Sequence, residues 1–118
     1  MRQGRKSFSA SNYYNTEVAI NELQNMSQSA SSSVTSVSDS DSNQTLLSAN
    51  LDRKGLILFN NSTAIAYVKF GATATSSDFT IRLVPYGTYD SNMPVYTGRI
   101  DAIWASNASG SMLITELS

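Results

Sequence analysis

The chain has 118 residues, with eight basic and nine acidic side chains, no histidine and no cysteine. This length fits one domain, and a domain of this size buries a modest core, so association with other subunits is a common source of stability. The missing cysteines exclude disulfides and thiolate chemistry, and the missing histidines exclude a Ser-His-Asp site and the commonest metal ligand. We therefore expect no enzymatic activity, no catalytic residues, no cofactor and no metal site.

Charge is distributed unevenly along the chain. Arg2, Arg5 and Lys6 lie within the first six residues, which leaves five of the eight basic residues against all nine acidic ones. A nucleic-acid-binding domain normally carries its basic residues on a folded face, so nucleic acid is not an expected partner. No apolar run is long enough to cross a bilayer, and the first residues lack the apolar stretch of a signal peptide. We expect synthesis in a cytoplasm and no membrane partner.

Residues 1–33 are predicted to form an extended N-terminal arm. Segment 16–26 predicts one short helix, because Asn15 or Thr16 can cap it and its apolar residues recur at spacings of three or four. A serine-rich linker follows the helix. Aromatic side chains are unusual in a segment that stays disordered, so we predict that those of the arm dock on a partner or on the protein's own β-domain. The predicted attachment residues are Arg2, Arg5, Lys6, Phe8, Tyr13 and Tyr14.

Residues 34–118 are predicted to form an all-β domain. Short segments with alternating apolar and polar residues are separated by turn sequences, a pattern typical of a sandwich or small barrel. The expected strands cover residues 44–49, 55–60, 64–71, 79–84, 86–90, 98–105 and 111–117. Segment 34–37 is a candidate edge strand. The sequence thus predicts a small antiparallel β-sandwich or barrel of about seven or eight short strands after the arm.

Turn chemistry separates these strands. Residues 60–62, Asn-Asn-Ser, predict a tight hairpin turn because Asn tolerates positive φ. Residues 84–87 place Pro second and Gly fourth, as a type I turn prefers. Residues 106–110 join the last two strands, and residues 52–54, Asp-Arg-Lys, read as a charged loop before a strand.

The alternation assigns side chains to the two faces of each strand. The residues expected to face inward include Phe79, Ile81, Leu83, Ile100, Ala102 and Trp104. Asp101 is expected to face outward. Further apolar residues remain on the expected outer faces, and two explanations are open. Bulges can shift the register and bury some of them, or a neighbouring subunit can cover them.

We favour the neighbouring subunit, because small domains rarely expose so much apolar surface on a second face. The predicted interface residues are Ile65, Tyr67, Val84, Ile103, Met112 and Ile114. One face of the last strand contributes the final two of these. The expected assembly is a homo-oligomer, with a trimer as the preferred form.

Asp39, Asp41 and Asn43 resemble the start of a calcium-binding loop. Gln44 stands where that loop needs Gly, and Asn50 stands where it needs Glu. A polar turn is therefore the better interpretation, and no metal is expected.

Two other groups of residues suggest chemistry. Asp101 and Glu116 would form a carboxylate pair if their strands were adjacent, although a solvated surface is the simpler interpretation. Several tyrosines could line a sugar-binding face, but tyrosine is also a favourable strand residue. These tyrosines are Tyr67, Tyr86, Tyr89 and Tyr96.

Three ordered blocks of the sequence resemble small virion structural proteins of tailed bacteriophages. The first block is residues 50–71, NLDRKGLILFNNSTAIAYVKFG, and the second is residues 79–89, FTIRLVPYGTY. The third is YTGRIDAIW at residues 96–104, followed by ITEL at residues 114–117. The resemblance spans residues 50–118. Segment 90–94 departs from the shorter spacing of the pattern, and residues 1–43 are not covered.

The resemblance implies a β-sandwich that is built into a virion and carries no catalytic residues. We expect a capsid decoration (cement) or head-fibre protein, with the major capsid protein or another virion protein as partner. The expected location is the virion, after synthesis in the host bacterial cytoplasm. The alternatives are a tail, neck or baseplate component and, in a different class, a host-surface carbohydrate-binding module.

Overall fold

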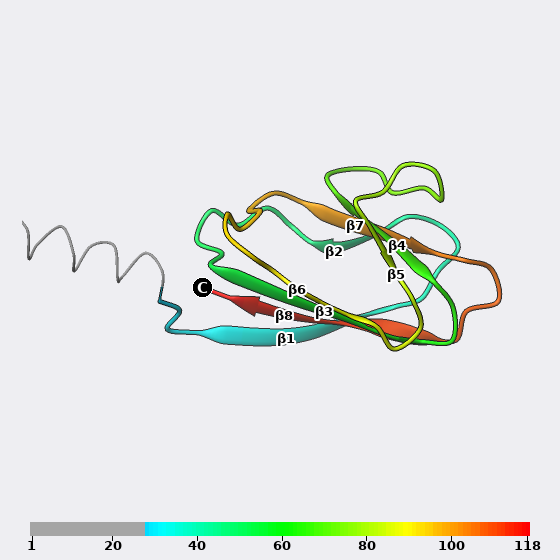
Figure 1. Ribbon diagram of the computed structural model, residues 1–118, viewed down its shortest axis with the longest axis horizontal. Coiled ribbons are helices and arrows are strands. Elements are labelled where there is room, and N and C mark those ends of the chain that lie inside the picture. The colour runs from blue at the N-terminus through cyan, green and yellow to red at the C-terminus, as the bar shows by residue number, and fades with distance from the viewer. Residues whose placement is uncertain (1–27) are drawn as a thin grey trace, which may run out of the picture.

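A computed structural model describes residues 28–118, and these residues form eight β-strands and no helix (Figure 1). The strands are β1 (Ser32–Ser38), β2 (Gln44–Leu47), β3 (Gly55–Ser62), β4 (Ala66–Phe70), β5 (Ile81–Leu83), β6 (Thr88–Asp90), β7 (Ile100–Trp104) and β8 (Gly110–Leu117). The predicted helix and all six attachment residues of the arm lie outside the described residues. β1 begins two residues before the predicted start of the β-domain.

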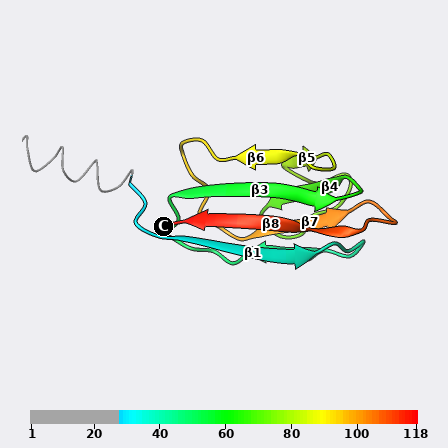
Figure 2. The ribbon, with the colours of Figure 1, turned by 90° about the horizontal axis from the view of Figure 1, so that it is seen from below.

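The strands form two four-stranded antiparallel sheets that pack face to face (Figures 1 and 2). Sheet A has the order β1-β8-β3-β6, and sheet B has the order β2-β7-β4-β5. Four of the pairs are nested in the sequence: β1 with β8, β2 with β7, β3 with β6, and β4 with β5. Successive nested pairs belong alternately to sheet A and sheet B. The chain therefore forms one long hairpin that crosses between the two sheets at its corners, which is the jelly-roll arrangement. The predicted all-β sandwich is confirmed.

Each of the seven predicted strand segments contains a strand, with ends that shift by up to a few residues. The predicted edge strand at 34–37 lies within β1, which forms one edge of sheet A. β3 has sheet neighbours on both sides and carries apolar residues on both faces, with Leu56 and Leu58 buried and Ile57 and Phe59 half-buried. This burial pattern suits a central strand.

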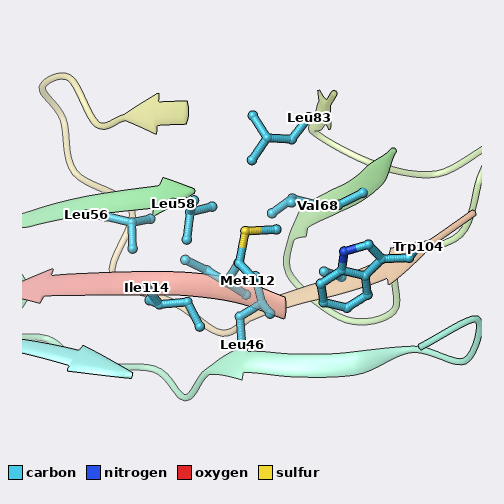
Figure 3. Close-up of a cluster of buried hydrophobic side chains, with 11 residues drawn as sticks. Leu46, Leu56, Leu58, Val68, Leu83, Trp104, Met112 and Ile114 are labelled. Carbon is cyan, nitrogen blue, oxygen red and sulfur yellow. The ribbon is translucent and has the colours of Figure 1, made fainter. Parts of the chain in front are cut away.

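The core fills the space between the sheets (Figure 3). It consists of Leu46, Leu56, Leu58, Ala66, Val68, Leu83, Ile100, Ala102, Trp104, Met112 and Ile114. The predicted inward direction is therefore correct for Leu83 and for the alternate residues of β7. Each fully buried large apolar side chain contributes about 1.5–3 kcal/mol, so these residues supply the main stabilisation of the sandwich.

Two predictions of side-chain direction are wrong. Met112 and Ile114 are fully buried in the core, so they are not available to a subunit interface, and Leu113 faces out instead. Phe79 is 37% exposed rather than inward. The backbone bends at Thr80, which breaks the alternation that would have carried Phe79 to the inner face.

The predicted hairpin turn at residues 60–62 is also wrong, because β3 continues through Ser62 and pairs with β8 up to Gly110. Asn60 is fully buried, and its Nδ2 donates to the carbonyl oxygens of Ala64, Leu83 and Val84 at 2.8, 2.9 and 3.1 Å. Its Oδ1 accepts from Ser62 Oγ at 2.6 Å and from Trp104 Nε1 at 3.3 Å. A buried amide needs such partners, and here they connect the two sheets.

The turn at residues 84–87 forms where expected but with a different geometry. The Gly87 N–H donates to the Val84 carbonyl at 2.9 Å, which closes the four-residue turn. Tyr86 has a φ of 61°. A positive φ at the third position is the mark of a type II turn, whereas type I keeps that φ negative.

The charged loop at residues 52–54 conceals a buried arginine. The Arg53 side chain is fully buried; Nε donates to Glu116 Oε2 at 2.8 Å, and Nη1 and Nη2 make three further hydrogen bonds to backbone carbonyl oxygens. These carbonyls belong to Ser48 at 2.8 Å, Tyr96 at 2.9 Å and Gly98 at 3.0 Å. Arg53 thus joins the β2–β3 and β6–β7 connections to the end of β8.

Asn60→Ala is expected to lower the free energy of unfolding by about 2–4 kcal/mol, because three carbonyls and the Trp104 indole N–H lose a buried partner. Asn61→Ala is the matched control, since Asn61 is exposed on the same strand, and its effect should stay within about 0.5 kcal/mol. Urea unfolding of both variants measures the difference. Equal stabilities of the two variants would contradict the role of Asn60.

Candidate functional site

The outer face of sheet B carries a row of large side chains. Tyr67 in β4 lies directly opposite Ile103 in β7 and Arg82 in β5. Directly opposed residues of an antiparallel pair share a face. Tyr67 and Ile103 are both half-buried and alternate with core residues, so this row faces away from the core.

A second apolar row lies beside the first. Ala66 pairs with Leu83, so the next step of the same register places Ile65 opposite Val84. Both flank core residues and therefore face outward; Val84 is 48% exposed. The two rows bring together four of the six predicted interface residues on one face.

Phe79 completes this surface. Its ring lies 5.0 Å from that of Tyr67 at an interplanar angle of 53°. We refer to Ile65, Tyr67, Phe79, Val84 and Ile103 together as the sheet B patch. The sequence analysis did not assign Phe79 to this surface. The polar residues just before Phe79 could have indicated that the strand, and with it the in-and-out alternation, begins only after Phe79.

The connection between β4 and β5 positions Phe79 on this face. Lys69 Nζ pairs with Asp78 Oδ2 at 2.6 Å, and the Phe70 N–H donates to Thr80 Oγ1 at 2.9 Å. Thr75 and Asp78 exchange backbone hydrogen bonds of 3.0 and 3.2 Å within the connection. These contacts hold the connection against β4, so Phe79 stays over Tyr67.

The same connection covers a buried carboxylate. Asp101 faces outward from β7 as predicted, yet it is fully buried. It accepts hydrogen bonds from Arg99 at 2.8 and 3.0 Å and from Asn43 Nδ2 at 2.9 Å. Asn43 Oδ1 in turn accepts from the N–H of Ala74, a buried residue of the connection, at 2.8 Å. Asn43 therefore links the Asp101 carboxylate to the β4–β5 connection.

The pKa of Asp101 reflects two opposing effects. Burial raises the pKa, but hydrogen bonds from Arg99, Asn43 and Thr45 favour the ionised form and outweigh burial, so the pKa is lowered. Asp101 is therefore a structural anion at neutral pH. It does not have the raised pKa of a general acid.

The carboxylate pair considered from the sequence does not form. Asp101 lies in β7 of sheet B, whereas Glu116 lies in β8 of sheet A. Each carboxylate pairs with its own arginine, Arg99 and Arg53 respectively.

The four tyrosines do not form a single platform. Tyr67 lies in the sheet B patch, and Tyr86 is 59% exposed in the β5–β6 turn. Tyr89 and Tyr96 instead pack around the Phe70 ring, at centroid distances of 5.9 and 4.9 Å, and extend the core. A sugar-binding face built from these four side chains is therefore contradicted.

The calcium-like segment serves as a corner of the fold. Asp39 Oδ1 accepts from the Gly110 N–H at 3.0 Å, and Asn43 holds Asp101. Across residues 28–118, no three or more Asp, Glu, His or Cys side chains gather in a group that could hold a metal ion.

Comparisons of the chain with protein-family models, curated proteins and solved structures give no match. The described part of the chain contains no helix with the length and apolarity needed to span a membrane.

Asp101→Asn is expected to have a lower free energy of unfolding than the wild type at neutral pH. The difference between the two proteins should disappear in acid. The folded-state pKa of Asp101 lies below its unfolded value, so its contribution is complete above about pH 4 and disappears as pH falls through the folded pKa. Urea unfolding at several pH values measures the difference between the two proteins.

Asp52→Asn serves as the control, because Asp52 is exposed in the β2–β3 connection. Its difference from the wild type should remain within about 0.5 kcal/mol at every pH. A deficit of Asp101→Asn that grows as the pH falls below about 4 would contradict the sign of the shift.

Proposed function

We propose that this protein is a non-enzymatic structural component of a tailed-phage virion, of the capsid decoration or head-fibre type. In this proposal the β-domain associates through the sheet B patch, preferably as a homotrimer, and the arm attaches each copy to the shell. The observation that carries the proposal is the sheet B patch. It is a contiguous apolar surface on the outer face of a sheet whose inner face is already packed.

The position of the family-like blocks supports the proposal. Block 50–71 includes Arg53, all of β3 and all of β4, and block 79–89 includes Phe79 and Val84. Block 96–104 contains β7 with Ile103. The blocks therefore coincide with the residues that build the sandwich and the sheet B patch, as expected if both are shared with the virion proteins that the sequence resembles.

The geometry of the patch also favours a protein partner. Val84 and Phe79 leave 48% and 37% of their surfaces exposed beside the half-buried Tyr67. Apolar and aromatic side chains are typical of the centre of an interface. Arg82 is exposed in the same row as Tyr67 and suits the rim, because arginine is enriched at interfaces.

Attachment through an arm fits the requirements of a shell protein. A segment that orders on binding can cover a large surface with modest affinity per contact. Association of several β-domains places several arms on one assembly, and linked weak contacts add to a strong attachment.

Val84→Lys is expected to abolish the trimer, because association would bury a charge in the apolar patch. Leu51→Lys is the matched control: Leu51 is 89% exposed in the β2–β3 connection, away from the patch. Sedimentation velocity of the wild type and both variants gives the test. A trimer that survives Val84→Lys but not Leu51→Lys would place the interface elsewhere.

Deletion of residues 1–27 is expected to leave a folded β-domain that still self-associates but no longer attaches to the particle. The cut preserves Ser29, whose Oγ donates to the Ser118 carbonyl at 2.9 Å, and all of β1. Cosedimentation with virions lacking the protein, compared with the full chain, measures attachment. Equal attachment of the truncated and full chains would contradict the role of the arm.

Gold labelling of the full chain on virions then separates the two virion locations. Label on the head supports decoration or head-fibre function. Label confined to the tail, neck or baseplate replaces that function with the alternative.

A further inference from the structure

β1 is the exposed margin of sheet A. It pairs with β8 on one side, and Figure 2 shows no strand of the described chain on its other side. Six of its seven residues are exposed, and Val37 alone is half-buried against the core.

The hydrogen-bond phase shows which backbone groups of β1 point away from β8. Ser31 and Ser118 exchange both N–H···O bonds, each of 3.0 Å, and the same register continues along β1. In an antiparallel pair, residues alternate between those that exchange such bonds and those that do not. Odd-numbered residues therefore bond to β8. The N–H and C=O groups of Ser32, Val34, Ser36 and Ser38 point outward, and they have no partner among residues 28–118.

Within residues 28–118, the outward side of β1 carries none of the features that normally protect a strand edge. Such edges are usually short, bulged, charged or interrupted by proline. β6 and β5, the edges opposite β1 and β2, have three residues each, and β2 has four residues and a register shift. β1 has seven residues, all of them serine, threonine or valine.

We propose that β1 pairs antiparallel with β1 of a second copy of this chain, across a twofold axis at Thr35, so that the two A sheets become continuous. A twofold axis perpendicular to a sheet pairs residues of equal parity, because residues on one face must stay on that face. Centring the axis on Thr35 overlaps the whole strand. It also makes the outward-pointing residues the hydrogen-bonded pairs: Ser32 with Ser38 and Val34 with Ser36.

A second copy fits this edge because the edge is complementary to itself. Each outward N–H meets an outward C=O of the other copy, and every opposed side chain is small and uncharged. No like charges face each other, which would be unfavourable across a strand pair. The contact uses an edge of sheet A rather than the sheet B patch, so it goes beyond the proposed function and does not depend on it.

The test is oxidative cross-linking of the full-length Thr35→Cys variant. The chain has no native cysteine, so each disulfide reports the introduced position. The proposed register places the two Thr35 residues opposite each other in a non-hydrogen-bonded pair, with Cα atoms about 4.5 Å apart, which a disulfide can bridge. A covalent dimer is therefore expected under mild oxidation.

Ser33→Cys is the matched control, because Ser33 lies on the same face of β1 and is also exposed. In the proposed register Ser33 opposes Val37 of the other copy, so the two Ser33 residues are offset by four positions, or about 13 Å. Little dimer is expected there. Equal cross-linking at both positions, or none at Thr35→Cys, would overturn the proposal.

Substitutions at Ser36 test the backbone pairing in the Thr35→Cys background. Ser36→Pro removes an outward N–H in each copy, which an edge strand tolerates, and the dimer yield should fall about tenfold. Ser36→Lys keeps the N–H but places charge at the edge, and should also lower the yield. Unfolding midpoints confirm that each variant is folded. A folded variant that cross-links as well as Thr35→Cys alone would overturn the strand pairing.

Discussion

The corners of the jelly roll impose the main constraint on this fold. At both ends of the sandwich the chain leaves one sheet for the other, and carbonyl groups there lose their ladder partners while they are buried or partly shielded from water. Such groups need other donors. Arg53, just before β3, supplies them at one end, and Asn60, near the end of β3, supplies them at the other.

Asn60 also influences what the outer surface of sheet B presents. Asn60 Nδ2 holds the carbonyls of Leu83 and Val84, so it fixes the point where β5 turns and where Val84 faces outward. Its Oδ1 holds Trp104, two residues along β7 from the core residue Ala102. The sheet B patch thus lies on a part of the sandwich that a buried amide aligns from within. Loss of that amide would disturb the patch as well as the core.

The sequence predicts the strands better than it predicts the polar side chains. Alternation is a local property, and it locates every strand, including the weak edge segment that becomes β1. The role of Arg53 depends on carbonyls more than forty residues away at Tyr96 and Gly98, and no local pattern contains that information. The prediction for Asn60 is wrong for a related reason. The sequence Asn-Asn-Ser is typical of turns, but the contacts of Asn60 with Trp104 and with the β5–β6 corner are long-range, and the segment continues β3.

In the candidate site, too, local patterns are predictable and long-range contacts are not. The sequence placed four apolar residues on the outer face because they occupy positions where the alternation calls for polar ones: Ile65, Tyr67, Val84 and Ile103. Met112 and Ile114 were misassigned because β8 is apolar on both faces, so its alternation cannot tell which face meets the core. The position of Phe79 depends on the β4–β5 connection, which the Lys69–Asp78 ion pair holds in place. This connection is not a strand, so its sequence has no alternation from which the direction of Phe79 could be predicted.

Few side chains of this chain are charged, and three ion pairs join six of those among residues 28–118. Charged residues make up 14% of the sequence, below the roughly 25% typical of soluble globular domains. Arg53, Lys69 and Arg99 each pair with a carboxylate of the same chain. The seven residues of β1 and the five residues of the sheet B patch are uncharged, and the exposed Arg82 lies at the rim of the patch.

The two proposed contacts differ in physical character and in symmetry. Pairing of β1 fixes register and direction through backbone hydrogen bonds, whereas the sheet B patch gains its energy from burial of side chains. A twofold contact and a threefold contact on separate surfaces, used together, extend an assembly in more than one direction instead of closing it at one ring. A repeating shell presents such repeated attachment sites, so the two contacts together would suit a protein that coats one.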